Sequence, residues 1–302
     1  MTNSPVAVEV KESGSENPLE GVRLVFVGAG VMAESMIAGL LKRQLVAPAQ
    51  VSGSHPRAAR RAELEAAYGI RVSESNREAV SLAAASGGAG AGARASGSII
   101  ILAVKPQKLD GVLRELRDAL RAGDLVLSIV AGARIETMAS ELSHTAIVRA
   151  MPNTPAQVGE GMTVWTATAQ VDEARRRQVS VMLGALGREM RVEEERQIDM
   201  ATALSATGPT YIFLVMESLV DAGVHMGFSR EVARELVLQT MFGSVRFAME
   251  SHKHPAELRN MVTSPGGTSA EAIYQMEKGG LRTVLSKAVY AAFQRAVALG
   301  KK

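Results

Sequence analysis

A glycine-rich loop near the amino terminus restricts the fold of this chain more than any other feature. The apolar run Arg23–Val27 enters a G-x-G-x-x-A turn formed by Gly28, Gly30 and Ala33, and a helical pattern follows. In such a unit the first glycine makes the tight turn, the second lets the backbone approach a pyrophosphate, and the small third residue lets the helix pack closely on the strand. The loop therefore predicts a dinucleotide-binding βαβ unit rather than a glycine-rich turn without a ligand.

Strand-like and helical segments alternate from residue 22 to about residue 150. This alternation predicts a parallel sheet with helices on both faces and ligands at the carboxyl ends of its strands. The predicted strands are Arg23–Val27, Gln50–Gly53, Ser98–Val104, Leu125–Ile129 and Ala146–Arg149. The predicted helices are Met32–Arg43, Arg57–Tyr68, Leu109–Leu120 and Ile135–Leu142.

Strand signals disappear after Met190, and helical periodicity continues to the end of the chain. The predicted helix Tyr211–Val224 is apolar over more than one face, which is typical of a helix buried between layers or between subunits. The others are Arg230–His252, Ser269–Lys278 and Leu281–Leu299. We therefore predict an α/β Rossmann-like dinucleotide-binding domain over residues 21–195, followed by an all-α C-terminal oligomerisation domain over residues 196–302. A monomeric helical core is the alternative.

Two segments stand outside this plan. Residues 1–20 are polar and of mixed charge, which predicts a disordered leader rather than a secretory signal. Residues 83–97 consist almost entirely of Ala, Gly and Ser, and we interpret them as a flexible insertion without chemistry.

Composition argues against several other classes of protein. Hydrophobic residues make up 47% of the 302 residues and charged residues 22%, as in a globular protein of two domains. The net charge of +3, with 4% aromatic residues and no dense basic stripe, argues against nucleic-acid binding. No apolar run approaches the roughly 18 residues of a membrane span. Cysteine is absent and the five histidines lack metal-ligand spacing, so we expect a cytoplasmic protein without a metal, nucleic-acid or membrane partner.

The end of the second predicted strand indicates which nicotinamide cofactor fits. An NAD site usually has an acidic residue there that accepts from the ribose 2′-hydroxyl. This chain has Ser54, His55 and Arg57 instead, and these hydroxyl, imidazole and guanidinium groups suit a 2′-phosphate. We therefore predict NADPH, with NADH as a weaker alternative. Arg60 and Arg61 are interpreted as part of a solvated helix face.

A second motif lies near the carboxyl terminus, in the block Leu258–Ser269. Pro265 ends the preceding helical pattern, and Gly266 and Gly267 allow a sharp turn before a new amphipathic stretch. We expect Thr268 and Ser269 to lie at the N-cap of that stretch. A helix start offers free N–H groups and a positive dipole end, which suit a small carboxylate.

Taken in order, the motifs of this chain resemble those of the Δ1-pyrroline-5-carboxylate reductases, the NADPH-dependent enzymes of the last step of proline synthesis. The resemblance covers about 240 residues, and its last block is the most specific. The matching segments are Phe26–Ala33, Ala103–Pro106, Arg149–Pro155, Gly208–Tyr211, Gln239-Thr240 and Leu258–Ser269.

The resemblance implies a role for individual residues. For the cofactor it implies pyrophosphate contacts from Val27, Gly28, Ala29, Gly30, Val31 and Met32, adenosine-side contacts from Ser54, His55 and Asn76, and nicotinamide-side contacts from Ala103, Val104, Lys105 and Ala131. For the substrate it implies Gly267, Thr268 and Ser269, with the Ser269 hydroxyl as the catalytic group beside the ring nitrogen, and it links Glu195 to that nitrogen in some members. A solvated acidic run, Glu193-Glu194-Glu195, is the alternative for Glu195. The family also implies dimers assembled into a ring.

Three positions depart from the family pattern. This chain has Ser205-Ala206-Thr207-Gly208-Pro209 where the family has Ser-Gly-Ser-Gly-Pro, Val31 where a polar residue is usual, and Ser269 where threonine is common. The change at Ser269 keeps a hydroxyl, whereas the other two bear on substrate range. Reduction of a related cyclic imine acid, or an inactive NADP-binding oligomer, are therefore the alternative functions.

Overall fold

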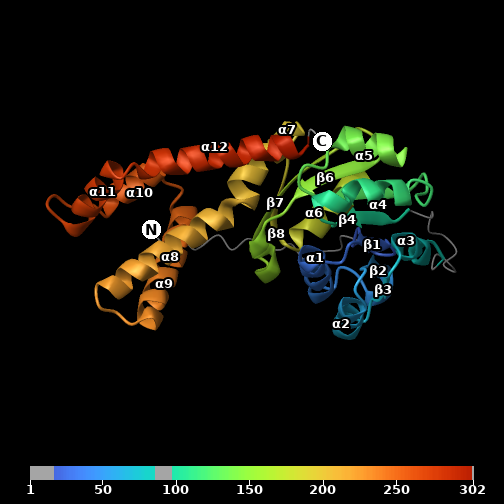
Figure 1. The fold of residues 1–302 in the computed structure, drawn as a ribbon, viewed down its shortest axis with the longest axis horizontal. Coiled ribbons are helices and arrows are strands. Elements are labelled where there is room, and N and C mark those ends of the chain that lie inside the picture. The colour runs from blue at the N-terminus through green and yellow to red at the C-terminus, as the bar shows by residue number, and fades with distance from the viewer. Residues whose placement is uncertain (1–16, 86–96, 301–302) are drawn as a thin grey trace, which may run out of the picture. The chain divides into compact units, whose positions relative to one another are not determined.

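The structure is a computed structural model that describes residues 17–85 and 97–300 (Figure 1). The chain divides into two compact units, unit 1 up to Ile198 and unit 2 from Asp199. The sequence placed this boundary three residues earlier, between residues 195 and 196. Each unit is described separately below.

Unit 1 is built on an eight-stranded sheet in the order β3-β2-β1-β4-β5-β6-β7-β8. The strands are β1 (Leu24–Val27), β2 (Val51–Ser54), β3 (Arg71–Ser73), β4 (Ile99–Leu102), β5 (Leu125–Ser128), β6 (Ile147–Met151), β7 (Gly161–Ala167) and β8 (Gly187–Arg191). The pairs from β3 to β6 are parallel, as predicted. Beyond residue 150, where the predicted parallel segment ends, β7 runs antiparallel to β6, and β8 then pairs with β7 in parallel.

Helices cover both faces of this sheet. Alternate residues of β1 and β4 enter two different cores, because successive side chains of a strand point to opposite faces. Phe26 and Ile101 pack with α1 (Val31–Lys42), α2 (Ala58–Tyr68) and α6 (Glu173–Gly184). Val27 and Ile100 pack with α3 (Asn76–Ala85), α4 (Leu109–Leu116) and α5 (Ile135–Leu142). Three short 3₁₀ turns complete this part of the chain, η1 (Pro48–Gln50), η2 (Pro106–Lys108) and η3 (Thr154–Val158).

Two of the predicted irregular segments are shorter than expected. Leu19 is fully buried in the first core, and Asn17 Nδ2 donates to the Leu45 carbonyl at 2.8 Å, so the end of the predicted leader is part of the fold. Residues 83–85 of the predicted insertion form the last part of α3. The remainder of both segments, 1–16 and 86–96, lies outside the described residues.

Unit 2 consists of helices. After α7 (Arg196–Ala201), which spans the boundary, a π-helical turn η4 (Thr202–Ala206) leads into α8 (Gly208–His225). The others are α9 (Arg230–Ser251), α10 (Pro255–Met261), α11 (Thr268–Lys278) and α12 (Leu281–Leu299). Of these, α8 and α9 pack on each other, α11 contacts α12, and α12 also contacts η4.

The helices of unit 2 leave most of their apolar surface uncovered. In the described part of the unit the buried hydrophobic residues are Ala203, Val220, Ala233 and Ala296. Large side chains such as Phe213 and Phe242 are 59% and 61% exposed. A monomeric helical core, the alternative considered for this region, is therefore not what forms. By length and composition the run Arg196–His225 could also cross a membrane, with a mean hydropathy of 1.3 over its most apolar stretch.

Candidate functional site

The glycine loop after β1 has a backbone that only glycine adopts readily. Gly28 has a φ of +86°, and a Cβ atom there would lie 2.5 Å from Cγ1 of Val104. The Gly28 N–H donates to Ser54 Oγ at 3.2 Å, and the Ala29 N–H donates to the Ser54 carbonyl at 2.8 Å. Gly30 is the N-cap of α1, so the loop delivers the start of a helix to the carboxyl edge of the sheet. This geometry suits a pyrophosphate, which binds at helix N-termini.

The other predicted cofactor residues gather along the same edge. Ala103 follows β4 directly, and its N–H donates to the Val27 carbonyl at 2.9 Å, which places Val104 beside the glycine loop. Lys105 is exposed and forms the N-cap of η2. Ala131 lies in the loop between β5 and α5. Since β1, β4 and β5 are neighbouring parallel strands, all these residues lie at one edge of the sheet.

A chain of hydrogen bonds fixes the adenosine side of this edge. Ser54 Oγ donates to Asn76 Oδ1 at 2.6 Å, and Asn76 Nδ2 donates to Glu115 Oε2 at 2.6 Å. The Ser54 hydroxyl thus connects the glycine loop to the start of α3. Glu115 on α4 was not among the predicted site residues, because nothing in its local sequence indicates that it orients an amide 39 residues away.

The imidazole of His55 is held in one tautomer. Its Nδ1 accepts the N–H of Arg57 at 3.2 Å, so in the neutral ring Nε2 carries the proton and is a donor. Partial burial lowers the pKa of His55 below its ordinary value, and the positive charges of Arg57, Arg60 and Arg61 lower it further. This corner of unit 1 is therefore electropositive, as a 2′-phosphate site would require.

The interpretation of Arg60 and Arg61 as a solvated face is wrong. The Arg60 side chain is 16% exposed and pairs with Glu34 of α1 and Glu63 of α2. The Arg61 side chain is 20% exposed, pairs with Glu74 and donates to two carbonyls of the loop after β2. Both guanidinium groups hold α2 in place.

In unit 2, the predicted substrate segment differs from expectation by one residue. The N-cap of α11 is Gly267, with a φ of −82°, and Thr268 and Ser269 are the first two residues of the helix rather than its cap. The helix can begin one residue early because Gly266, with a φ of +68°, already completes the turn. The Gly267 N–H donates to the Ser264 carbonyl at 3.0 Å, so it is not available to a carboxylate. The first N–H groups to donate within the helix are those of Ala270 and Glu271, and both donate to the Gly267 carbonyl. The N–H groups of Thr268 and Ser269 come before them, at the open start of the helix.

Glu195 is not part of a solvated acidic run. Its Oε1 accepts from Arg149 Nη1 at 2.8 Å and from the N–H of Ile135 at 2.9 Å. Arg149 is only 1% exposed. No local pattern indicates this ion pair, because its members lie 46 residues apart.

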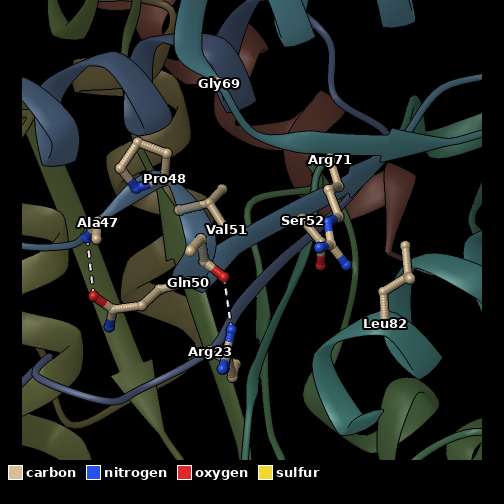
Figure 2. Close-up of a pocket in the computed structure, with 10 residues that line it drawn as sticks. Arg23, Ala47, Pro48, Gln50, Val51, Ser52, Gly69, Arg71 and Leu82 are labelled. Atoms are coloured by element: carbon tan, nitrogen blue, oxygen red, sulfur yellow. Dashed lines mark hydrogen bonds between the residues drawn. The ribbon is translucent and has the colours of Figure 1, made fainter. Parts of the chain in front are cut away.

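A cavity of about 540 Å³ in unit 1 lies away from these residues (Figure 2). Arg23, Gln50 and Arg71 line it, and they stand at the amino-terminal ends of β1, β2 and β3. Because nucleotides bind at the carboxyl ends of parallel strands, this cavity is at the opposite edge from the glycine loop. Among residues 17–85 and 97–300, no group of three or more His, Asp or Glu side chains is placed to hold a metal ion.

The glycine loop, the cofactor edge and the separate helical unit define a dinucleotide-dependent oxidoreductase. Residues 23–132 match the family model described as NADP oxidoreductase coenzyme F420-dependent, and residues 195–299 match that for pyrroline-5-carboxylate reductase dimerisation. The chain belongs to the pyrroline-5-carboxylate reductase family, as its sequence motifs indicated.

Similar proteins extend over nearly the whole chain. The pyrroline-5-carboxylate reductases of Synechocystis and Pseudomonas aeruginosa are 37% and 39% identical to it, over 93% of this chain and 99% and 97% of theirs. Among solved structures, the Plasmodium falciparum pyrroline carboxylate reductase with NADP bound is 30% identical, with a TM-score of 0.81 over 93% of this chain and 99% of that one. The enzyme from Coxiella burnetii is 33% identical, with a TM-score of 0.80 over 93% of this chain and 99% of that one.

Proposed function

We propose that this protein reduces the cyclic imine of Δ1-pyrroline-5-carboxylate to L-proline with NADPH. The observation that carries the proposal is the shape of the glycine loop, in a chain whose relatives of the same length are pyrroline-5-carboxylate reductases. The space that a Cβ of Gly28 would fill is occupied by Val104, so the loop can only be this tight with glycine. The loop ends at Gly30, the N-cap of α1, so the N–H groups in the first turn of this helix would hold the pyrophosphate.

The reaction requires positioning more than acid–base chemistry from the protein. Bound NADPH supplies a hydride to the carbon of the C=N bond. The glycine loop, from Val27 to Met32, would hold the pyrophosphate, and Ala103, Val104, Lys105 and Ala131 would border the nicotinamide end. These groups lie on strands and their immediate ends, so they are held rigidly enough to orient a cofactor.

The substrate would be held at the start of α11. The N–H groups of Thr268 and Ser269 lie in the first turn, where the helix dipole favours a carboxylate. The Ser269 hydroxyl would contact the ring nitrogen and stabilise its protonated form as the hydride arrives. The turn at Gly267 would shape the site through its backbone position, since its N–H is already bonded to Ser264.

The preference for NADPH over NADH is assigned to the corner after β2. Arg57 is exposed, whereas Arg60 and Arg61 are engaged in ion pairs, so Arg57 is the guanidinium available to a 2′-phosphate. The neutral His55 ring would donate through Nε2. Ser54 and Asn76 would support this corner through their mutual hydrogen bond.

The helices of unit 2 are proposed to form the interface of a homodimer. The family model for dimerisation covers residues 195–299, and the exposed side chains of α8 and α9 in this range include Phe213, Leu236 and Phe242. We extend the proposal to a ring of dimers in the cytoplasm, with no nucleic-acid or membrane partner. Light scattering at micromolar concentration should give a multiple of 31.9 kDa, and a clean monomer would contradict the proposal.

Steady-state oxidation of NADPH in the presence of pyrroline-5-carboxylate tests the proposed reaction. Turnover with this imine and formation of proline support it. Turnover only with pyrroline-2-carboxylate or a six-membered homologue would assign the protein to a related imine acid, which the departures at Val31 and Ser205–Pro209 would explain. NADPH binding without turnover of any of these imines would instead indicate an inactive NADP-binding oligomer.

A further inference from the structure

A carboxylate stands at the end of the hydrogen-bond chain on the adenosine side of the cofactor edge. The chain runs from the Gly28 N–H through the Ser54 hydroxyl to the Asn76 amide, whose Nδ2 donates to Glu115 Oε2 at 2.6 Å. Glu115 lies on α4, whereas the other three residues belong to the glycine loop, the end of β2 and the start of α3. Glu115 is thus the one acidic residue among the four, and it belongs to a different helix from the amide that it binds.

The carboxylate determines which end of the Asn76 amide faces it. A carboxylate only accepts hydrogen bonds, so it binds the NH2 group of the amide and repels the carbonyl oxygen. The carbonyl oxygen Oδ1 therefore faces Ser54, whose hydroxyl donates to it at 2.6 Å. The lone pairs of Ser54 Oγ are then left for the Gly28 N–H, which donates at 3.2 Å. The charge of Glu115 thus sets the direction of every hydrogen bond in the chain.

Further contacts hold Glu115 in position. Its carbonyl accepts from Arg77 Nε at 2.7 Å, so the start of α3 is joined to α4 through the main chain of Glu115 as well as through its side chain. The neighbouring Leu113 and Leu116 of α4 are fully buried and anchor this helix in the second core. Asn76 and Glu115 are themselves half-buried, where a hydrogen bond to a charged group is stronger than in water.

The Asn76 amide keeps one donor for the cofactor in this orientation. Its NH2 group has two N–H bonds, and the bond to Glu115 uses one of them. Among residues 17–85 and 97–300, no second residue accepts from Asn76 Nδ2. An amide turned over by half a rotation would present its carbonyl oxygen in the same place. That oxygen could not donate to a phosphate or ribose oxygen of the cofactor.

We propose that Glu115 is a positioning residue for the adenosine side of NADPH: its charge keeps the NH2 group of Asn76 turned towards α4, with the second N–H available to the cofactor. This inference rests on the proposed function, in which Asn76 supports the corner after β2. Glu115 acts through Asn76 and does not itself contact the cofactor. Its removal therefore weakens NADPH binding no more than removal of the Asn76 amide does, and it has no effect once that amide is gone.

A double-mutant cycle between Glu115 and Asn76 tests this role. Glu115→Met removes the acceptor and keeps the approximate size of the side chain, and Asn76→Ala removes the amide. Glu115→Gln keeps a hydrogen-bonding group of the same size, which can pair with either end of the Asn76 amide.

The matched control is Asp118→Asn, which removes an acidic charge three residues further along the chain. Asp118 lies 3.8 Å from Arg77 in an ion pair whose side chains are both exposed, and such pairs contribute little. Three quantities are measured for every variant: the Kd of NADPH by calorimetry without imine, the KM of the imine at saturating NADPH, and the melting temperature.

Asn76→Ala should raise the Kd of NADPH roughly three- to tenfold, which is the order of one lost hydrogen bond. Glu115→Met should approach this value. Glu115→Gln should raise the Kd only about twofold, because an amide held equally well in both orientations leaves about half of the molecules competent to bind. The double variant Asn76→Ala/Glu115→Met should bind NADPH as Asn76→Ala does, since the second change has nothing left to act on.

The KM of the imine should stay unchanged in all these variants, and Asp118→Asn should match the wild-type protein. Should Glu115→Met fail to fold, Asn76→Ala/Glu115→Gln provides the same comparison, because glutamine keeps the size and a hydrogen-bonding group at this position.

Two outcomes would overturn the inference alone. If the losses of the two single variants multiply in the double variant, Glu115 acts independently of Asn76. If Glu115→Met lowers the melting temperature and leaves the Kd of NADPH unchanged, its role is to join α3 to α4 and nothing more. Wild-type protein that binds no NADPH would refute the proposed function and this inference together, so the two kinds of failure are distinguishable.

Discussion

Alanine at Gly28 and at Gly30 should have opposite effects, although both residues belong to the same loop. At Gly28 the φ of +86° is strained for alanine, and the new Cβ would lie 2.5 Å from Val104 Cγ1 and 3.1 Å from Val104 Cα. The left-handed conformation costs about 1–2 kcal/mol and overpacking a further 1–3 kcal/mol. Gly28→Ala should therefore destabilise the protein by about 2–5 kcal/mol, and since a Cα atom cannot rotate away, little of this strain can be relieved.

At Gly30 the backbone has a φ of −82° and a ψ of −167°, which alanine adopts without strain. The nearest atom to its Cβ would be the Gly28 carbonyl oxygen at 4.0 Å. Gly30→Ala should therefore change the free energy of unfolding by less than about 1 kcal/mol, because the gain through the unfolded chain is offset by the poorer N-cap that alanine makes. The methyl group would instead occupy the space through which a pyrophosphate approaches the backbone, so the Kd of NADPH should rise at least about tenfold.

Thermal melts and calorimetry with NADPH on the same preparations check both expectations. For a unit of this size about 2–4 °C of melting temperature is lost per kcal/mol, so Gly28→Ala should melt roughly 4–20 °C below the wild-type protein. Equal melting temperatures for the two variants would refute the steric argument at Gly28. Normal NADPH binding by Gly30→Ala would refute the assignment of the loop to the pyrophosphate.

Substitutions at three further residues test the proposed site. Ser269→Ala should lower kcat/KM roughly 10- to 100-fold while leaving the Kd of NADPH unchanged. Ser269→Thr should retain activity. If Ser269→Ala has normal kinetics but a lower melting temperature, the role of Ser269 is structural only. Arg57→Ala should weaken NADPH roughly tenfold or more and leave NADH unchanged in calorimetry, whereas equal losses for both cofactors would remove Arg57 from the phosphate site. The pKa of His55 is lowered in the free protein, and a bound 2′-phosphate would raise it. Between the pKa of the free protein and that of the complex, NADPH should therefore bind more tightly as the pH falls. The ratio of NADPH Kd values for His55→Gln and wild-type protein should therefore grow as the pH falls from 8 to 5.5, and a constant ratio would contradict contact between His55 and the phosphate.

The sequence predicted those parts of the fold whose signals are local and strong. Strands such as Ile99–Leu102 are continuous apolar runs, and helices such as Ile135–Leu142 show clear periodicity. It missed β3, which has three residues, β7 (Gly161–Ala167), and β8, Gly187–Arg191, whose side chains are largely exposed at the edge of the sheet. An edge strand with polar side chains lacks the apolar pattern on which such predictions depend.

The site was predicted to a similar extent. The glycine loop and the segment around Ser269 are contiguous motifs, and they could be found from the sequence. The pairing of Arg60 with Glu34, and of Arg149 with Glu195, depends on contacts between elements that only the folded chain brings together. The one-residue error at the start of α11 has a local cause, because Gly267 serves as a cap without a side chain.

The scarcity of buried side chains in unit 2 makes protein concentration a determinant of stability. The buried hydrophobic residues in its described part are mainly alanines, which contribute little burial energy, and residues such as Phe213 and Tyr290 remain largely exposed in one chain. We expect such a unit to complete its core against another copy, as obligate dimers do. Its melting temperature should therefore fall on dilution. A chain newly released from the ribosome would then reach its final stability only after meeting a second one.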